Sequence, residues 1–434
     1  MGQNSFIFNI NKCVGCNACV VGCSIENGTK IPLNWRVVNS ANLIKHPDLP
    51  VFHYSLACNH CEEAPCMNNC PALAYSRDEK TGAVIHHAEA CIGCKYCTWA
   101  CPYDAPKFNP ETRIVEKCNF CVDRINEGEK PACTVACPVG ALDFGQPVLN
   151  KENYIQPGFV NTGIKPSIQL IPLRDNSKQT KTLGSEKTTY TQKIDFEQLP
   201  SKIQVRKEWT LLLFTLIAAL LIGILPFSFN IRRFTSQEEI LFVGMGILAM
   251  FLSSFHLGKK LRAWRSILNL KKSWLSREIF SFSGFIFFVA LYFYLGIEWL
   301  AWSAMAMGVL SLISIDMVYK LTYRKDKLIF HSAMVWLTGL LIFGLAIQSD
   351  FLIAMTLTAK ITLYSARKYQ LKRFSFLSIL RLSGLIGLIV YWAISPFDIP
   401  VWLYLLLGLG ELIDRAEFYH EIEIITPKSG LGKS

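Results

Sequence analysis

Charged residues are scarce in this sequence of 434 residues. Asp, Glu, Lys and Arg make up 18% of it and hydrophobic residues 51%, whereas a soluble globular chain carries about 25% charged residues. Intrinsic disorder requires the opposite balance of polar and apolar residues, so it is excluded. A wholly soluble enzyme is also disfavoured, because part of this chain must avoid water.

Signatures of several common functions are absent as well. The chain has no GxGxxG dinucleotide-binding sequence, no P-loop and no nucleophile elbow, so we expect no substrate pocket of those types. Its N-terminus, MGQNSFIFNINKC, lacks a basic stretch followed by an apolar one, and no secretory signal is expected. The net charge of +11 comes from Lys and Arg clustered between apolar runs, which is typical of membrane topology rather than of nucleic-acid binding.

Cysteine is absent from residues 138–434, while all sixteen cysteines lie between Cys13 and Cys137. The apolar runs show the opposite distribution, since those long enough to cross a bilayer all begin after Lys207. A polar stretch between the two regions cannot bury enough apolar surface to fold alone. We therefore expect a cysteine-rich domain at 1–172, a linker at 173–205, a membrane region at 206–420 and a polar tail at 421–434.

Apolar runs of about 20 residues are needed to cross a bilayer as helices. Five runs are clear: Trp209–Pro226, Ile240–Leu257, Ile279–Ile297, Trp299–Tyr319 and Leu328–Ile347. Three are weaker: Phe351–Tyr364 is short, Phe374–Ile394 contains Arg381 and Ile399–Ile413 contains Glu411. We predict an all-α bundle of about eight membrane helices, with seven as the alternative if a weak run is a buried or interfacial helix.

Basic residues are unevenly divided between the predicted loops. With eight helices, the loops after helices 2, 4 and 6 share one side with both termini. They carry Lys259, Lys260, Arg262, Arg265, Lys271, Lys272 and Arg277; Lys320, Arg324, Lys325 and Lys327; and Arg367, Lys368, Lys372, Arg373 and Arg381. The opposite loops offer only Arg232 and Arg233. Because positive loops stay in the cytoplasm, we expect a multi-pass protein of the cytoplasmic membrane whose cysteine domain faces the cytoplasm.

The sixteen cysteines divide into four quartets with none left over. They are Cys13, Cys16, Cys19 and Cys23; Cys58, Cys61, Cys66 and Cys70; Cys91, Cys94, Cys97 and Cys101; and Cys118, Cys121, Cys133 and Cys137. The first and third have the spacing CxxCxxCxxxC, and a proline follows the last three quartets. This spacing is typical of iron–sulfur proteins in which three thiolates hold one cluster and the fourth holds a second cluster.

Two other uses of cysteine are weaker interpretations. A disulfide framework requires an oxidising compartment, which the expected topology contradicts. Structural zinc typically takes two separated cysteine pairs rather than uninterrupted triples. The nearby histidines, His60, His86 and His87, are expected to be surface or packing residues rather than ligands.

Short strands are predicted between the quartets, at Ser5–Asn9, Gly82–Ile85, Arg113–Glu116 and Ala141–Phe144. A strand, a cysteine loop and a short helix thus recur four times, an order that resembles two bacterial dicluster ferredoxin modules. The predicted fold is therefore an α+β iron–sulfur domain followed by an all-α transmembrane bundle.

The amino-acid sequence around the quartets resembles that of a more specific family. CNHCEEAPCMNNCPALAYSRDEKTGAVIHHAEACIGCKYCTWACPYDAPKF and KCNFCVDRINEGEKPACTVACPVGALDFG are similar to the four-cluster electron-transfer subunit of the dimethyl-sulfoxide-reductase family of molybdoenzymes, over about residues 5–172. The stretches Phe255–Ile279 and Gly410–Tyr419 resemble that family's quinol-oxidising anchor, whose members have eight helices. The chain would then be a fusion of the two subunits.

The resemblance implies how the quartets share four [4Fe–4S] clusters. Cys13, Cys16, Cys19 and Cys137 would hold the cluster facing a catalytic partner, and Cys118, Cys121, Cys133 and Cys23 the one nearest the membrane. Cys58, Cys61, Cys66 and Cys101 would hold one middle cluster, and Cys91, Cys94, Cys97 and Cys70 the other. Some relatives replace one cysteine and carry a three-iron cluster, but no replacement occurs here.

His256 and Glu278 are the candidate proton acceptors for quinol, since ionisable residues at membrane depth are functional candidates and quinol oxidation releases protons. The family resemblance links this His and this Glu to quinol binding. Arg262, Asn269, Ser273 and Trp274 are expected to shape the site. The alternative is that both lie in the membrane interface, with Glu278 paired to Arg277 or Lys272.

Other ionisable residues of the membrane region receive structural roles. Asp316, Arg381, Glu411 and Arg415 are expected to pair within the bundle, and His331 to pack. We expect no bound haem, because no pair of histidines has suitable spacing.

These expectations combine into an electron-transfer and membrane-anchor subunit. It would oxidise menaquinol from the quinone pool of the lipid bilayer and pass electrons through four clusters to a separate molybdopterin subunit. The terminal acceptor stays open among dimethyl sulfoxide, amine N-oxides, nitrate, tetrathionate and polysulfide. The alternatives are a redox-coupled proton-translocating protein, a quinone reductase running in reverse and a zinc-stabilised membrane scaffold.

Overall fold

The computed structural model describes residues 4–40, 51–146, 159, 163–172, 174, 202–320, 330–371, 374–394 and 401–422. The chain divides into two units, Met1–Pro200 with Ile424–Ser434 and Ser201–Glu423, and each is described by itself. Most of the predicted linker at 173–205 and of the polar tail at 421–434 lies outside the described residues.

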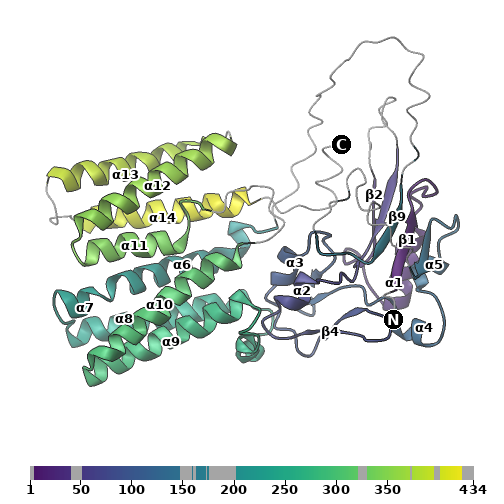
Figure 1. Cartoon of the computed structure of the whole chain (residues 1–434), viewed down its shortest axis with the longest axis horizontal. Helices are drawn as coiled ribbons and strands as arrows, with labels where there is room; N and C mark the ends of the chain where they lie inside the picture. Colours follow the sequence, from purple (N-terminus) through teal and green to yellow (C-terminus); the bar gives the residue numbers. More distant parts are fainter. Residues whose placement is uncertain are drawn as a thin grey trace, which may run out of the picture. The chain divides into compact units, whose positions relative to one another are not determined.

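The first unit is an α+β fold built around a small sheet that joins its two ends. Strand β1 (Ser5–Asn9) pairs antiparallel with β8 (Leu142–Gly145) and parallel with β9 (Ile168–Ile171) (Figure 1). Phe6 and Phe8 alternate with more exposed residues along β1 and are buried, as expected for a strand with one face on the core. This pairing brings the last quartet back beside the first.

Three hairpins complete the strands of this unit. They are β2 (Val37–Ser40) with β3 (His53–Leu56), β4 (Tyr75–Arg77) with β5 (Val84–His86), and β6 (Lys107–Asn109) with β7 (Ile114–Glu116). The four predicted strands coincide with β1, β5, β7 and β8 to within two residues. The cysteine loops lead into the short helices α1 (Ala18–Asn27), α2 (Pro65–Asn68), α3 (Tyr96–Ala100), α4 (Val122–Asn126) and α5 (Ala132–Val135).

The second unit is helical, and every predicted apolar run overlaps one helix. The helices are α6 (Val205–Ile224), the short α7 (Phe227–Asn230), α8 (Ser236–Ser254), α9 (Trp274–Leu295), α10 (Glu298–Val318), α11 (Val335–Ala346), α12 (Asp350–Leu371), α13 (Phe376–Ile394) and α14 (Val401–Glu421). A 3₁₀ helix at Lys260–Ile267 lies between α8 and α9.

Five spans in the described residues are long and apolar enough to cross a membrane: Val205–Asn230, α8, α9, α10 and α13. The prediction for Leu328–Ile347 was wrong in length, because α11 has 12 residues and covers only about 18 Å at 1.5 Å per residue. The weaker run at Phe374–Ile394 is instead a full-length candidate, α13. Helices α12 and α14 are long, but their charged residues lower their hydropathy.

Helix α6 holds the helical unit together. It packs against α8, α10, α11 and α14, while α9 packs on α8 and α10, and α12 packs on α11 and α13 (Figure 1). Gly223 of α6 explains the close approach to α11, because a Cβ there would lie 2.8 Å from the Gly339 carbonyl oxygen and 2.7 Å from Ile342 Cβ. Small residues at such crossings let helix backbones approach closely in a membrane.

Three residues assigned to a basic loop are instead buried inside helices. Arg367 and Lys368 lie in the last two turns of α12, and Arg381 lies in α13. All three are at most 3% exposed and paired with acids of α14. They therefore do not count as loop charges. The predicted loop residues Arg324, Lys325, Lys327, Lys372 and Arg373 lie outside the described residues.

Candidate functional site

Three cavities in the first unit are each lined by four cysteines. One has Cys13, Cys16, Cys19 and Cys137 in its wall; the second has Cys58, Cys61, Cys66 and Cys101; the third has Cys70, Cys91, Cys94 and Cys97. In every case three cysteines come from one quartet and the fourth from its partner quartet. The fold thus interleaves the first quartet with the fourth and the second with the third.

The remaining four cysteines also lie together. The Asn27 side-chain amide is 3.8 Å from the sulfur atoms of both Cys23 and Cys121. Cys23 also interacts electrostatically with Cys133 and Cys118. These groups of neighbouring cysteines have the same members as the ligand sets that the family resemblance implies, and their role as cluster ligands stays a prediction.

A single backbone turn recurs at the start of all four quartets. The residue two positions after the first cysteine has a positive φ each time: 72° at Gly15, 43° at His60, 71° at Gly93 and 68° at Phe120. This conformation turns the backbone N–H back toward the cysteine, and His60, Gly93 and Phe120 donate to sulfur at 3.4 Å. Cys13 accepts in the same way from Gly15. Such N–H groups stabilise negative charge on sulfur.

The cysteine cavities fit iron–sulfur clusters. Burial raises the pKa of the Cys23 thiol to about 12, so a bound metal is needed to stabilise the thiolate form that serves as a ligand. Among the residues with described positions, no group of three or more His, Cys, Asp or Glu side chains is arranged for a single metal ion.

The three histidines near the quartets differ in their surroundings. His60 is fully buried, accepts a hydrogen bond from the Val84 N–H at 2.9 Å and lies 3.6 Å from the Phe120 ring. His86 packs on Tyr75, with ring centroids 4.9 Å apart. His87 is partly exposed and bonded to Ser76.

The membrane candidates lie at one end of the α8–α9 helix pair. His256 is half-buried two residues after α8 ends at Ser254, and Glu278 lies in the second turn of α9. Glu278 is 6% exposed, and no Lys, Arg or His nitrogen of a described residue lies within 4 Å of its carboxylate. Arg277 does not pair with it: the guanidinium donates to the carbonyls of Leu270 and Lys271 and covers Trp274.

The residues expected to shape the site lie in the connection between α8 and α9. Arg262 is half-buried in the 3₁₀ helix, and Asn269 is 7% exposed. Ser273 is buried and caps α9 by accepting from the Ser276 N–H, and Trp274 is the first residue of α9. These four residues therefore flank the N-terminal end of the helix that carries Glu278.

Two charged residues from other helices interact electrostatically with Glu278, namely Arg415 of α14 and Asp316 of α10. Their own separation is 3.6 Å. Arg415 also donates to the Ala333 carbonyl at 2.7 Å. The Asp316 carboxylate accepts from the Val335 and Trp336 N–H groups at 2.9 and 3.0 Å, and thereby caps the positive end of the α11 dipole.

A row of buried ion pairs joins α12 and α13 to α14. Glu411 pairs with Lys360 at 2.8 Å and with Arg381. Further along α14, Asp414 pairs with Arg367 at 2.7 Å, and Glu421 pairs with Lys368 at 2.6 Å. The expected pairing of Asp316, Arg381, Glu411 and Arg415 within the bundle is thus confirmed, and His331 stacks on Phe418 at 3.9 Å.

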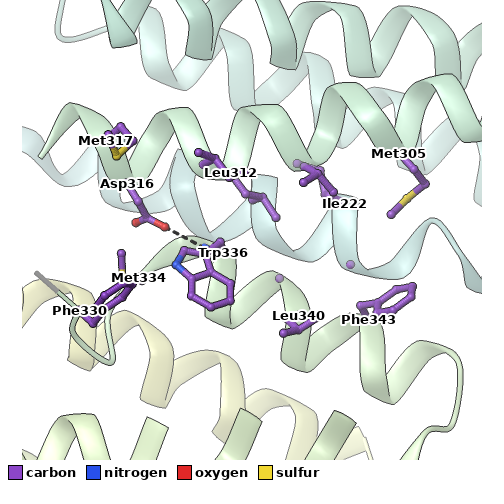
Figure 2. A pocket seen from close by; sticks show the side chains of 14 residues that line it. Ile222, Met305, Leu312, Asp316, Met317, Phe330, Met334, Trp336, Leu340 and Phe343 are labelled. Atoms are coloured by element: carbon purple, nitrogen blue, oxygen red, sulfur yellow. Dashed lines mark hydrogen bonds between the residues drawn. The ribbon is translucent and has the colours of Figure 1, made fainter. Parts of the chain in front are cut away.

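An apolar cavity of about 500 Å³ lies between α6, α10 and α11 (Figure 2). Ile222, Leu312, Leu340 and Phe343 contribute to its wall, and Asp316 is the one charged residue among its lining residues. Figure 2 shows the Asp316 carboxylate at one end, beside Trp336. Largely apolar pockets with few polar groups are typical of small-molecule sites.

Comparison with known proteins covers both units. Residues 50–147 match the model of the 4Fe-4S dicluster domain, and residues 204–399 match that of the DMSO reductase anchor subunit (DmsC). Over 151 residues the sequence is 35% identical to one chain of the anaerobic dimethyl sulfoxide reductase of Escherichia coli, covering 33% of this chain and 73% of that protein. The chain thus belongs to the dimethyl-sulfoxide-reductase family.

Other proteins similar to this chain are named for different activities. Thiosulfate reductase electron transfer subunit PhsB of Salmonella typhi is 40% identical over 152 residues, which are 33% of this chain and 76% of that protein. One subunit of the sulfite dehydrogenase of Allochromatium vinosum is 34% identical over 166 residues, which are 33% of this chain and 69% of that protein. This family member is therefore an iron–sulfur electron-transfer protein with a membrane anchor.

Sequence reasoning missed several buried charges of this family member. Arg36 and Lys117 are 1% and 3% exposed in the cysteine-rich unit, and Glu208 is 3% exposed near the start of α6. A single charged residue in a polar stretch carries no periodic signal, so only the fold reveals its burial.

Proposed function

We propose that this chain is the electron-transfer and anchor subunit of a molybdopterin oxidoreductase complex. It oxidises menaquinol in the membrane and passes the electrons to a separate catalytic subunit that reduces a terminal acceptor such as an S-oxide, an N-oxide or nitrate. One observation carries the proposal: a single chain of this family combines two features. They are four interleaved cysteine sets and the buried carboxylate of Glu278, which has no ion pair among the described residues.

Each cysteine set supplies four thiolates for one [4Fe–4S] cluster. When bound, such clusters accept and release single electrons. The chain's own contribution is to hold the thiolates in place and to direct backbone N–H groups at them, as Gly15, His60, Gly93 and Phe120 do. Cys16 is exposed, which favours the set that contains it as the exit toward the catalytic partner.

Glu278 and His256 accept the protons that quinol releases. An ionisable group buried in a membrane segment is costly unless it has a function or a partner, and Glu278 lacks an ion pair among the described residues. Because α8 ends and α9 begins at the same end of the pair, both acceptors lie on the side of the α8–α9 connection. The apolar cavity beside Asp316 offers room for the hydrocarbon part of a lipid-soluble quinol.

The orientation follows from the basic residues that remain in connecting segments. Without Arg367, Lys368 and Arg381, the α8–α9 connection and the first turn of α9 still carry seven Lys and Arg residues, against Arg232 and Arg233 in the preceding connection. With eight transmembrane helices, the positive-inside rule then assigns the cysteine-rich unit to the cytoplasm.

Replacing Glu278 with Gln tests the proton-acceptor role. Loss of a general base typically slows a reaction about 10²–10⁴-fold, so we expect quinol-dependent bleaching of cluster absorbance to slow by about 10²-fold while iron content is unchanged. Glu298→Gln is the matched control, since Glu298 is exposed at the start of α10. Reduction of the clusters by quinol at the wild-type rate in E278Q would reject the site assignment.

The buried ion pairs of α12–α14 favour a second candidate, redox-coupled proton translocation. Rows of ionisable residues in membranes serve as proton relays, and this row extends from Glu411 to Glu421. Proton flux measured in sealed vesicles during quinol turnover distinguishes the two functions. The anchor role alone releases only the two protons of each quinol, whereas a proton-translocating protein moves additional protons across the membrane. The same arrangement would also serve a quinone reductase, with the electrons flowing in the opposite direction.

A further inference from the structure

Arg36 lies in the interior of the cysteine-rich unit, just before β2. Its side chain is 1% exposed. Nη1 donates to the Ser55 carbonyl at 3.1 Å and to Ser55 Oγ at 3.0 Å, and the guanidinium lies 4.4 Å from the Phe6 ring centroid. These contacts hold the cation in one place, but none of them neutralises its charge.

The surroundings of Arg36 contain sulfur rather than carboxylates. In the part of the chain that the structure describes, Nε and Nη2 have no oxygen or nitrogen partner, and no Asp or Glu oxygen lies within ion-pair distance. The Arg36 side chain hydrogen-bonds to Cys133 and also interacts electrostatically with Cys19, Cys118 and Cys23. Three of these four cysteines belong to the set Cys23, Cys118, Cys121 and Cys133, and Cys19 belongs to the set that contains Cys13. An isolated cation in a protein interior costs several kcal/mol unless it is paired.

Lys117 repeats this pattern elsewhere in the unit. It is 3% exposed, and Nζ donates to the Cys118 carbonyl at 2.9 Å and to the Val84 carbonyl. It forms no ion pair with any acid of described position. Its charge acts on Cys66, a member of the set Cys58, Cys61, Cys66 and Cys101.

We propose that Arg36 and Lys117 are built-in counter-charges for two different iron–sulfur clusters and raise the reduction potentials of these clusters. The inference rests on the proposed function, in which the cysteine sets bind clusters. A cluster with four thiolates is an anion that becomes more negative when it takes up an electron. A buried cation therefore stabilises the reduced form more than the oxidised form.

The electron balance is simple, since one electron is gained and passed on while no bond forms or breaks. Arg36 acts chiefly on the cluster of Cys23, Cys118, Cys121 and Cys133, and Lys117 on that of Cys58, Cys61, Cys66 and Cys101. Each residue is a positioning charge rather than a ligand.

The test is a potentiometric titration of the full chain, purified anaerobically and reduced stepwise with dithionite, with low-temperature EPR as readout. R36Q should make one of the four reduction steps at least tenfold less favourable, which is about 59 mV for one electron. K117M should affect a different step. Each variant is thus the control for the other, and R36K should retain the wild-type potential.

Iron content is measured in parallel and separates the possible failures. If R36Q loses iron while R36K keeps it at the wild-type potential, the charge is required and the proposal stands. The proposal is overturned if R36Q keeps its full iron content and unchanged reduction potentials. It is also overturned if R36Q and R36K lose iron equally, because the site would then require the shape of the Arg side chain rather than its charge. Far fewer than about sixteen irons in the wild-type chain, four for each of four clusters, would overturn the proposed function itself, and the counter-charge role with it.

Discussion

Replacing Glu411 with Gln should destabilise the helical unit strongly. Glu411 lies in α14, is 6% exposed, and pairs with Lys360 at 2.8 Å and with Arg381. It also accepts a hydrogen bond from Thr338 at 2.6 Å. Glutamine keeps the shape and one acceptor but removes the charge. Lys360 would then lose its carboxylate partner, and Arg381 would share Asp414, 3.7 Å away, with Arg367.

The expected size follows from the burial of both cations. Removing one partner of a buried ion pair costs about 3–5 kcal/mol, which corresponds to about 10²–10⁴ in the equilibrium constant of unfolding. For a unit of about this size, 1 kcal/mol changes the melting temperature by about 2–4 °C. We therefore expect E411Q to melt about 6–20 °C below the wild type.

Thermal unfolding of the full chain in detergent, followed by circular dichroism, measures this change. Glu298→Gln is the control for loss of an exposed carboxylate, and it should change the melting temperature little. The double variant K360M/E411Q removes one cation together with the acid. It should lose less stability than E411Q alone, because the remaining charges are again balanced.

The double variant also decides whether the reasoning holds. Coupled residues give non-additive losses in a double-mutant cycle, whereas independent residues give losses that add within about 0.5 kcal/mol. Additive losses in K360M and E411Q would refute the assignment of Glu411 as the counter-charge of Lys360. A melting temperature of E411Q equal to that of the wild type would refute the burial argument itself.

Two further predictions concern the cysteine loop and the topology. Gly15→Ala should lower iron content, because φ is 72° there and a Cβ would lie 2.8 Å from the His53 ring; Gly28→Ala, with φ of 61° and open space, should retain full iron. Because residues 138–434 contain no cysteine, a single cysteine introduced at Lys271 should react with a membrane-impermeant thiol reagent only from the cytoplasmic side, and one at Arg233 only from the opposite side. Labelling of both positions from one side would contradict the orientation.

Local spacing was sufficient to predict which three cysteines share a loop. Cys13, Cys16 and Cys19 are three residues apart, so one loop brings them together whatever the rest of the chain does. The exchange of Cys23 for Cys137 depends on the pairing of β1 with β8, which the resemblance implied and which spacing alone does not specify. The ligand sets therefore required both kinds of information.

Hydropathy predicted where helices occur but not how their charges are used. Arg367 was expected in a loop because it follows the apolar run Phe351–Tyr364, yet Asp414, 47 residues away in the chain, lies 2.7 Å from it. Likewise, Glu278 could be identified as a candidate from its place near the membrane edge, whereas its electrostatic neighbour Arg415 comes from the last helix. Long-range pairing of this kind leaves no pattern in the sequence near either residue.

The two units neutralise their buried cations in different ways. In the helical unit, each buried Lys or Arg of described position lies within 4 Å of a carboxylate. In the described part of the cysteine-rich unit, Arg36 and Lys117 lie in equally dry surroundings without one. A folded chain does not keep unpaired cations in its interior without compensation, and in the proposal above this compensation comes from the cysteine sets. Neutral thiols cannot provide it, whereas thiolates bound to iron can, which is why the counter-charge role proposed for the two cations depends on clusters in these cavities.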